Sequence, residues 1–126
     1  MSVDMIEALR AHLETVIGVP CCAQMPSPRP DRFLYLERVG GVRSLAVDHP
    51  RITVEAWAET KKGAYDLVQQ VRDLIVIRLP PVIGGIRVIR HREDAGPSYE
   101  PPTMSGAYRY RVTVSIRHQL IIEEKP

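Results

Sequence analysis

The chain has 126 residues, of which 44% are apolar and 25% are charged, and its formal net charge is +2. A chain of this length buries roughly two thirds of its unfolded surface on folding, so we expect one domain over residues 1–126. A net charge this small does not by itself indicate nucleic-acid binding. Charged residues interrupt the apolar positions of residues 1–19, and no apolar stretch is long enough to span a bilayer. The sequence therefore predicts neither a secretory signal nor a membrane segment.

The two cysteines, Cys21 and Cys22, are neighbours in the sequence, which is a poor arrangement for a structural disulfide. We therefore expect two reduced, half-buried thiols, in keeping with the burial habits of free cysteine.

Motifs that carry chemistry are absent from the sequence. It contains no nucleophile elbow, no phosphate-binding glycine loop and no dinucleotide-binding fingerprint. The histidines share no metal-ligand spacing with one another or with the cysteine pair; they are His12, His49, His91 and His118. The sequence predicts that the protein is not an enzyme and that it has no metal and no cofactor.

The N-terminal half of the chain begins with a predicted helix over residues 3–17, which Gly18 ends. A short strand is predicted over residues 19–24, at a sheet edge because it contains a proline, and residues 25–31 form a proline-rich loop. Two apolar runs then flank Gly40-Gly41 and predict a β-hairpin; the runs are residues 33–39 and 42–47.

Residues 51–79 contain the clearest structural signal. Up to residue 59 the apolar residues alternate with polar ones, as in a strand covered on one face. After Thr60, a candidate N-cap, they recur at helical spacing; the helical stripe consists of Ala64, Leu67, Val68, Val71, Leu74 and Ile75. A strand that leads directly into an amphipathic helix can pack that helix on its own sheet, which favours a two-layer core.

The C-terminal part contains two further predicted strands, over residues 86–92 and 108–117. Between them, residues 93–106 are predicted to be a long mobile loop, and residues 121–126 a frayed tail. The fold class predicted is therefore α+β, with two helices packed on a mixed, largely antiparallel sheet in a single two-layer domain.

Two features exceed this background as candidate interface residues. Arginines are concentrated on the last two strands, at Arg87, Arg90, Arg92, Arg109, Arg111 and Arg117. They can be a solvated sheet face with cross-strand partners such as Glu55, or a surface that faces phosphates or an acidic partner subunit. The second feature is Trp57, which alternation places on the polar side of its strand. It is a core residue if the first helix covers that face, and otherwise an exposed aromatic of the kind enriched at interfaces.

The order of elements, with several short motifs, resembles one protein family. The motifs are Glu-Arg-x-Gly-Gly at 37–41, Val-Asp-x-Pro at 47–50, Thr-Val-Glu-Ala-Trp-Ala at 53–58, and a long proline-rich loop leading into the Tyr-Arg-Tyr-Arg strand at 108–117. Over residues 3–119 the chain is similar to the tail terminator, or tail completion, proteins of long-tailed bacteriophages, particularly those of actinobacterial hosts.

This resemblance implies a structural virion protein that assembles in the host cytoplasm into a hexameric ring at the head-proximal end of the tail. The ring stops polymerisation of the tail tube protein and provides the surface to which the head connector or stopper protein docks. DNA passes through its lumen without sequence-specific binding, and no catalysis, cofactor or membrane is involved. The loop over residues 93–106, with Tyr99, becomes a candidate contact with the tube or a neighbouring subunit, and the arginines line the lumen or form lateral ion pairs.

Three other functions remain open from the sequence. A head-to-tail adaptor or stopper has the same size and location without the capping role. A nucleic-acid-binding α/β module would use the arginine face, although Tyr108 and Tyr110 alternate to the face opposite Arg109 and Arg111, where they cannot stack bases among the arginines. A small-molecule-binding or enzymatic domain has the least support, because no set of catalytic residues converges.

Overall fold

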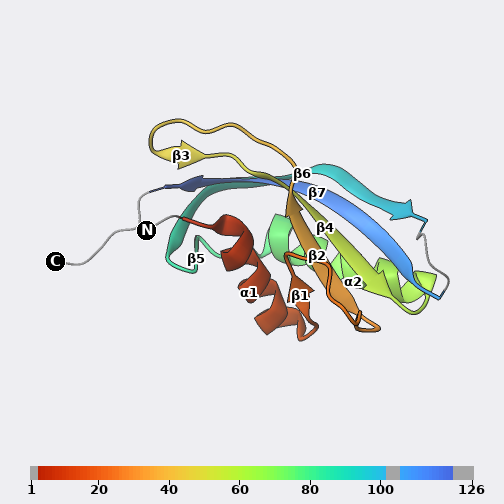
Figure 1. Cartoon of the computed structure of the whole chain (residues 1–126). Coiled ribbons are helices and arrows are strands. Elements are labelled where there is room, and N and C mark those ends of the chain that lie inside the picture. The colour runs from red at the N-terminus through yellow and green to blue at the C-terminus, as the bar shows by residue number, and fades with distance from the viewer. Residues whose placement is uncertain (1–2, 102–105, 121–126) are drawn as a thin grey trace.

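The computed structural model describes residues 3–101 and 106–120 and shows a curved sheet with its helices on one face (Figure 1). The elements in chain order are α1 (Met5–Ile17), β1 (Cys21–Cys22), β2 (Phe33–Arg38), β3 (Val47–Asp48), β4 (Arg51–Ala58), α2 (Lys61–Arg72), the π-helical turn η1 (Asp73–Ile77), β5 (Val82–Ile83), β6 (Ile86–Glu100) and β7 (Tyr108–Gln119).

Capping residues set the start of both helices and the end of α1. The Asp4 side chain accepts a hydrogen bond from the Glu7 amide at the start of α1, and Gly18 ends the helix with a left-handed backbone. The Thr60 hydroxyl accepts a hydrogen bond from the Gly63 amide at the start of α2. The last turn of α2 widens into η1, which keeps Ile75 buried.

The strand order of the sheet is β1-β2-β4-β7-β6-β5, with β3 paired to β7. Only β1 and β2 run parallel, and the other neighbours are antiparallel. The predicted α+β fold, with two helices on a mixed and largely antiparallel sheet, is confirmed. Strand β7 is the centre of this arrangement, because it pairs with β4 and β3 along one edge and with β6 along the other.

The hydrophobic core lies between the sheet and the two helices. Each central strand contributes every second side chain to it, as the alternation predicts, and each helix contributes one stripe. Its fully buried members include Leu9, Leu13, Leu34, Leu36, Ile52, Val54, Ala56, Leu67, Val68, Val71, Ile75, Val112, Val114 and Ile116. No helix of the described residues lies on the opposite, outer face of the sheet (Figure 1).

The predicted hairpin with a turn at Gly40-Gly41 is wrong. Strand β2 pairs with β4, from Phe33–Trp57 to Arg38–Ile52, and the chain between them forms a loop over residues 39–50. This 39–50 loop is a bent ribbon whose backbone hydrogen bonds join Val42 to His49 and Ser44 to Val47. The turn therefore lies at residues 44–47. The apolar run that suggested a strand is exposed, with Val42 at 75% and Leu45 at 94%.

The predicted loop over residues 93–106 is largely wrong as well. Strand β6 continues to Glu100 and stays paired with β7 through three register shifts, of which the one between Ala95 and Ser98 admits Gly96 and Pro97. Ion pairs hold this half of the strand: Glu93 binds Arg72 of α2 at 2.6 Å, and Asp94 binds Arg51 of β4 at 3.2 Å. Residues 102–105 of that predicted loop, and the predicted tail at 121–126, lie outside the described residues.

Gly41 shapes the 39–50 loop. Its φ is +107°, and a Cβ atom there would overlap the carbonyl oxygen of His49; Gly40 has a φ of +126° but open space at the same position. We expect Gly40→Ala to lower the free energy of unfolding by about 1–2 kcal/mol through backbone strain alone, and Gly41→Ala to lower it further, because His49 must also move. Urea denaturation of both variants checks this, and equal losses would contradict the described loop packing.

Candidate functional site

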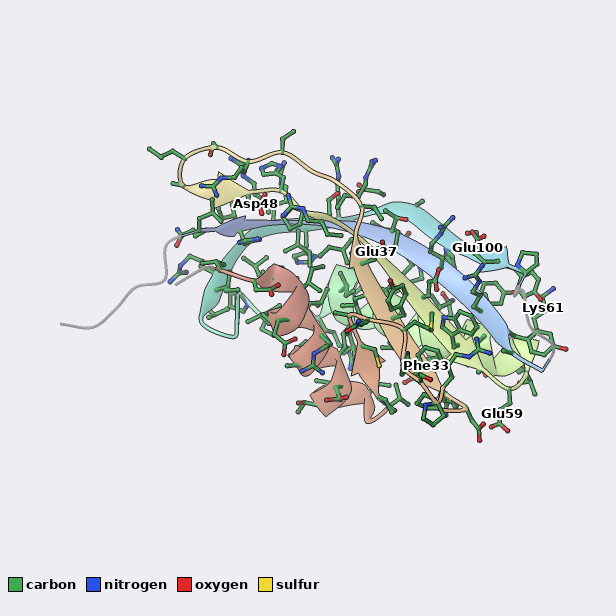
Figure 2. The ribbon with its side chains drawn as sticks, in the orientation of Figure 1. Phe33, Glu37, Asp48, Glu59, Lys61 and Glu100 are labelled. Atoms are coloured by element: carbon green, nitrogen blue, oxygen red, sulfur yellow. The ribbon has the colours of Figure 1, made fainter. Side chains whose placement is uncertain are left out.

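The outer face of the sheet carries most of the predicted interface residues, because alternation on β4 and β7 turns their charged side chains away from the helices. Figure 2 shows how far the sheet extends, from β3, which contains Asp48, to Glu100 at the end of β6. The residues on the outer face divide into a tryptophan end, a middle part with internal ion pairs, and an arginine-lined cleft.

Trp57 is neither a core residue under the first helix nor an exposed aromatic. It lies on the outer face, where it is 5% exposed. Its ring stacks on Phe33 with centroids 5.4 Å apart, and the guanidinium groups of Arg29 and Arg109 lie 5.1 and 5.2 Å from its centroid. Its indole N–H donates to Glu55 at 3.1 Å. The proline-rich loop and β7 therefore bury it, so Trp57 does not offer an exposed interface ring.

Tyr99 lies apart from the arginines, on the helix side of the sheet. Its ring is 5.5 Å from that of Tyr110, which in turn meets Tyr65 of α2 at 5.4 Å, and the Lys61 ammonium lies 4.4 Å from the Tyr99 centroid. These contacts fix the end of β6 to α2. The contacts of Tyr99 within the chain therefore give it a structural role.

Three of the six predicted arginines have a carboxylate partner within the chain. Arg109 pairs with Glu55 at 3.4 Å, as the cross-strand interpretation predicts. Arg111 pairs with Glu100 at 2.8 Å, and Arg92 pairs with Asp94 at 2.8 Å. The middle of the outer face is therefore largely neutralised by its own ion pairs.

The arginines without a carboxylate partner in the described part of the chain are Arg87, Arg90 and Arg117. Arg90 and Arg117 are register partners on β6 and β7, so their side chains emerge side by side. Arg87 is exposed and pairs in register with Val82 of β5, away from this group. Like charges directly opposite each other are unfavourable unless an anion lies between them.

Arg90 and Arg117 line a cleft of about 320 Å³ between the sheet and the 39–50 loop, which we call the arginine cleft. Arg51 and Arg92 also line it, and the 39–50 loop forms its other wall; the remaining lining residues are Val39, Gly41, Val42, His49, His91 and Ser115. His91 pairs in register with the buried Ile116, so its side chain lies on the helix side of the sheet, and its buried Nδ1 atom, which has no hydrogen-bond partner among the described residues, does not face the cleft.

Asp94 is the carboxylate nearest to this cleft. Its burial opposes ionisation, but hydrogen bonds from Ser115, Arg51 and Arg92 outweigh that effect and hold its pKa below the ordinary value. Asp94 is therefore a fixed anion that is already bound to two of the four arginines. Arg90 and Arg117 remain as cationic groups that Asp94 does not neutralise.

The cleft depends on an ion pair that holds the 39–50 loop. Arg38 donates two hydrogen bonds to Asp48, at 2.6 and 3.0 Å, and reaches the carbonyl of Gly40 at 3.1 Å. Asp48 is buried, and these hydrogen bonds from Arg38 are the main cause that lowers its pKa. The pair joins the end of β2 to β3, so it fixes one wall of the cleft.

The sequence alone did not indicate several residues of this site. Arg51, His49 and the valines of the 39–50 loop come from segments that were interpreted as strand or hairpin. Alternation along residues 51–59 indicated that Arg51 lies on the polar side of its strand, but not that it lies beside the 39–50 loop. Among the described residues there is no group of three side chains that could hold a metal ion, and both cysteines are free. Burial raises the pKa of Cys21 to about 12.

Comparisons with known proteins give no further identification. No protein-family model matches the chain, and no curated protein matches it. In the part of the chain that the structure describes, no helix has the length and apolar composition needed to cross a membrane.

The Arg38–Asp48 pair predicts a pH dependence. Folding lowers the pKa of Asp48, so the ionised carboxylate stabilises the folded chain. This stabilisation is fully present above the pKa of an unfolded aspartate, about 4, and is lost as the pH falls through the lower pKa of the folded state. We expect Asp48→Asn to lower the free energy of unfolding by about 1–2 kcal/mol near pH 6. Below about pH 4 the difference in free energy of unfolding between Asp48→Asn and the unmodified chain should shrink.

Urea denaturation at several pH values measures this difference. The control is Glu59→Gln, an exposed carboxylate at the opposite end of the sheet (Figure 2), which should change stability by less than about 0.5 kcal/mol. A loss for Asp48→Asn that stays constant between pH 3 and pH 7 would contradict the assigned role of the pair.

Proposed function

We propose that this chain is a structural subunit of a bacteriophage tail: a tail terminator that closes into a ring on the end of the tail tube. The proposal begins with the resemblance of the motifs at 37–41, 47–50 and 53–58 to that family. It places the protein in the virion, with the tube protein, the head connector or stopper and copies of itself as partners. DNA passes through the ring without sequence-specific contacts.

The observation that carries the proposal is the contrast between two parts of the outer face. The middle part is internally paired, through Arg109–Glu55 and Arg111–Glu100. The arginine cleft retains two arginines without a carboxylate partner among the described residues, and beside it the 39–50 loop exposes Val42 and Leu45. Unbalanced charge beside exposed apolar side chains is what a surface made for another protein presents.

The shape of the chain supports the same conclusion. The 39–50 loop stands off the sheet on the side opposite the helices, and β6 and β7 form a long ribbon across the whole molecule (Figure 1). Such protruding elements let a small subunit reach a neighbour without changing its core. A terminator needs contacts of this kind with neighbouring copies and with the tube.

The edge of the sheet at β6 argues for contact through side chains rather than through added strands. Strand β5 covers only the first two residues of β6, so the rest of that edge has no strand beside it in the described part of the chain. Three register shifts and several charged residues interrupt this edge. These are the features by which natural proteins prevent strand addition.

A second candidate is a nucleic-acid-binding module, which the arginine cleft favours. A duplex or single strand would need a basic surface that extends beyond one cleft. The paired middle of the outer face does not supply it. Filter binding at low salt separates the two functions, because nucleic-acid binding should be retained there and should fall steeply with added salt.

The terminator function is tested by adding the chain to polymerising tail tube protein. We expect shorter tubes, together with sedimentation of the chain with the tubes, because a cap on the growing end blocks further addition. Electron microscopy of tube lengths across a series of chain concentrations measures the effect. The control is the same polymerisation with buffer added in place of the chain.

Unchanged tube lengths with no sedimentation of the chain would overturn the terminator assignment. Sedimentation with purified connector protein, without any contact with tubes, would assign the chain to the adaptor or stopper class instead.

A further inference from the structure

The arginine cleft has more positive charge than the described chain neutralises. Four arginines line it, Arg51, Arg90, Arg92 and Arg117, and Asp94 binds only the first and third of them. Arg90 and Arg117 face each other across neighbouring strands. Two guanidinium groups in this position form a binding site for one or two carboxylates, each of which can accept paired hydrogen bonds.

The other wall of the cleft is apolar and does not suit a small ion alone. Val39 and Val42 line it beside Gly41 and His49, with exposed fractions of 46% and 75% for the two valines, and Leu45, outside the lining, is 94% exposed. A ligand that filled the cleft would place carboxylates on the arginines and apolar side chains against these residues. The ligand class that matches is a polypeptide segment with adjacent apolar and acidic residues.

The chain itself contains such a segment. Residues 121–124, which lie outside the described part, read Ile-Ile-Glu-Glu. They come one residue after Leu120, which follows the end of β7, and the last residue of β7, Gln119, pairs with Val47 next to the turn of the 39–50 loop. The two isoleucines match the apolar wall, and the two glutamates match the two unpaired arginines.

We propose that the arginine cleft of one copy binds residues 121–124 of a second copy, with Glu123 and Glu124 on Arg90 and Arg117 and the isoleucines against the 39–50 loop. The contact joins two different surfaces, so it is head-to-tail and generates a ring where the rotation closes. It specifies the subunit contact of the proposed terminator ring, and in that respect it rests on the proposed function.

The direction of the chain favours a second copy over the same copy. Gln119 pairs with Val47, and the Leu120 amide donates to the Ala46 carbonyl at 2.8 Å, so the chain still runs along the loop at residue 120. Arg117 lies behind this point. To return Glu123 to it, the chain would have to reverse within Ile121-Ile122, and β-branched residues are poorly suited to such turns.

The first experiment is an NMR titration of the ¹⁵N-labelled full chain with an acetylated peptide of residues 119–126. We expect saturable shifts of the amides of Arg90, Arg117 and Val42, with Tyr110 unaffected. A peptide with both glutamates replaced by lysine should bind about tenfold more weakly or not at all. Absence of saturable shifts at these amides would overturn the proposal, whether or not the chain caps tubes.

The same titration separates a peptide site from a phosphate site. Inorganic phosphate should shift these amides only at concentrations well above those of the peptide, because it makes no contact with the apolar wall. Saturation by phosphate at lower concentrations than by the peptide would identify the cleft as a phosphate site and overturn the proposal.

The second experiment exchanges the charges between two full chains. Chain one carries Arg90→Glu and Arg117→Glu, and chain two carries Glu123→Lys and Glu124→Lys. Each alone should self-associate about tenfold more weakly than the unmodified chain by light scattering, and their mixture should recover association, because each cleft then faces a tail of opposite charge.

The matched control for chain one is Arg87→Glu, a charge reversal on the same strand outside the cleft, and it should leave self-association unchanged. Weak association of chain one but not of chain two would mean that the cleft meets another acidic group, and would overturn the proposal. A mixture of the two chains that did not recover association would also overturn it. If the unmodified chain bound the peptide of residues 119–126 but did not shorten the tubes, the proposed function would be overturned and the contact at the cleft would stand.

Discussion

Strand β7 contacts β3, β4 and β6, and its side chains alternate between the helix layer and the outer face. Val112, Val114 and Ile116 are fully buried under the helices. The residues between them carry the polar and charged groups of the outer face. Moving this strand by one residue would exchange the two faces, so the core and the outer face are fixed by the same register.

The charge on the outer face follows from this division. Arginines that point away from the core gain carboxylate partners where a neighbouring strand places one opposite, as Glu55 does for Arg109 and Glu100 for Arg111. Where β6 places Arg90 opposite Arg117, the register supplies a second cation instead. The arginine cleft is thus a direct product of strand pairing, and the Arg38–Asp48 pair closes it by holding the 39–50 loop.

The sequence predicted the helices, the central strands and the core because each depends on local periodicity and capping. The prediction for residues 39–50 was wrong because two glycines between apolar runs are typical of a hairpin turn. In the structure Gly40 and Gly41 lie in a bent ribbon whose turn comes later, at residues 44–47. The prediction for residues 93–100 was wrong because the ion pairs of Glu93 and Asp94 with Arg72 and Arg51, which hold this segment in the sheet, join residues far apart in the sequence.

The candidate site was predicted in part. Concentration of arginines on two strands was visible, but the division into paired and unpaired arginines depends on register, which periodicity alone does not give. Trp57 shows the same limit: alternation correctly placed it on the outer face, yet its burial comes from Phe33 and from arginines on a loop and on another strand.

The proposed function requires that copies of this chain form a ring at the end of a tail tube. Cryo-electron microscopy of tubes assembled in the presence of the chain can show whether they do. We expect ring-shaped density on one end of the tube, with neighbouring subunits in contact at the arginine cleft. Chains bound along the side of the tube, or tubes with bare ends beside unbound chains, would contradict it.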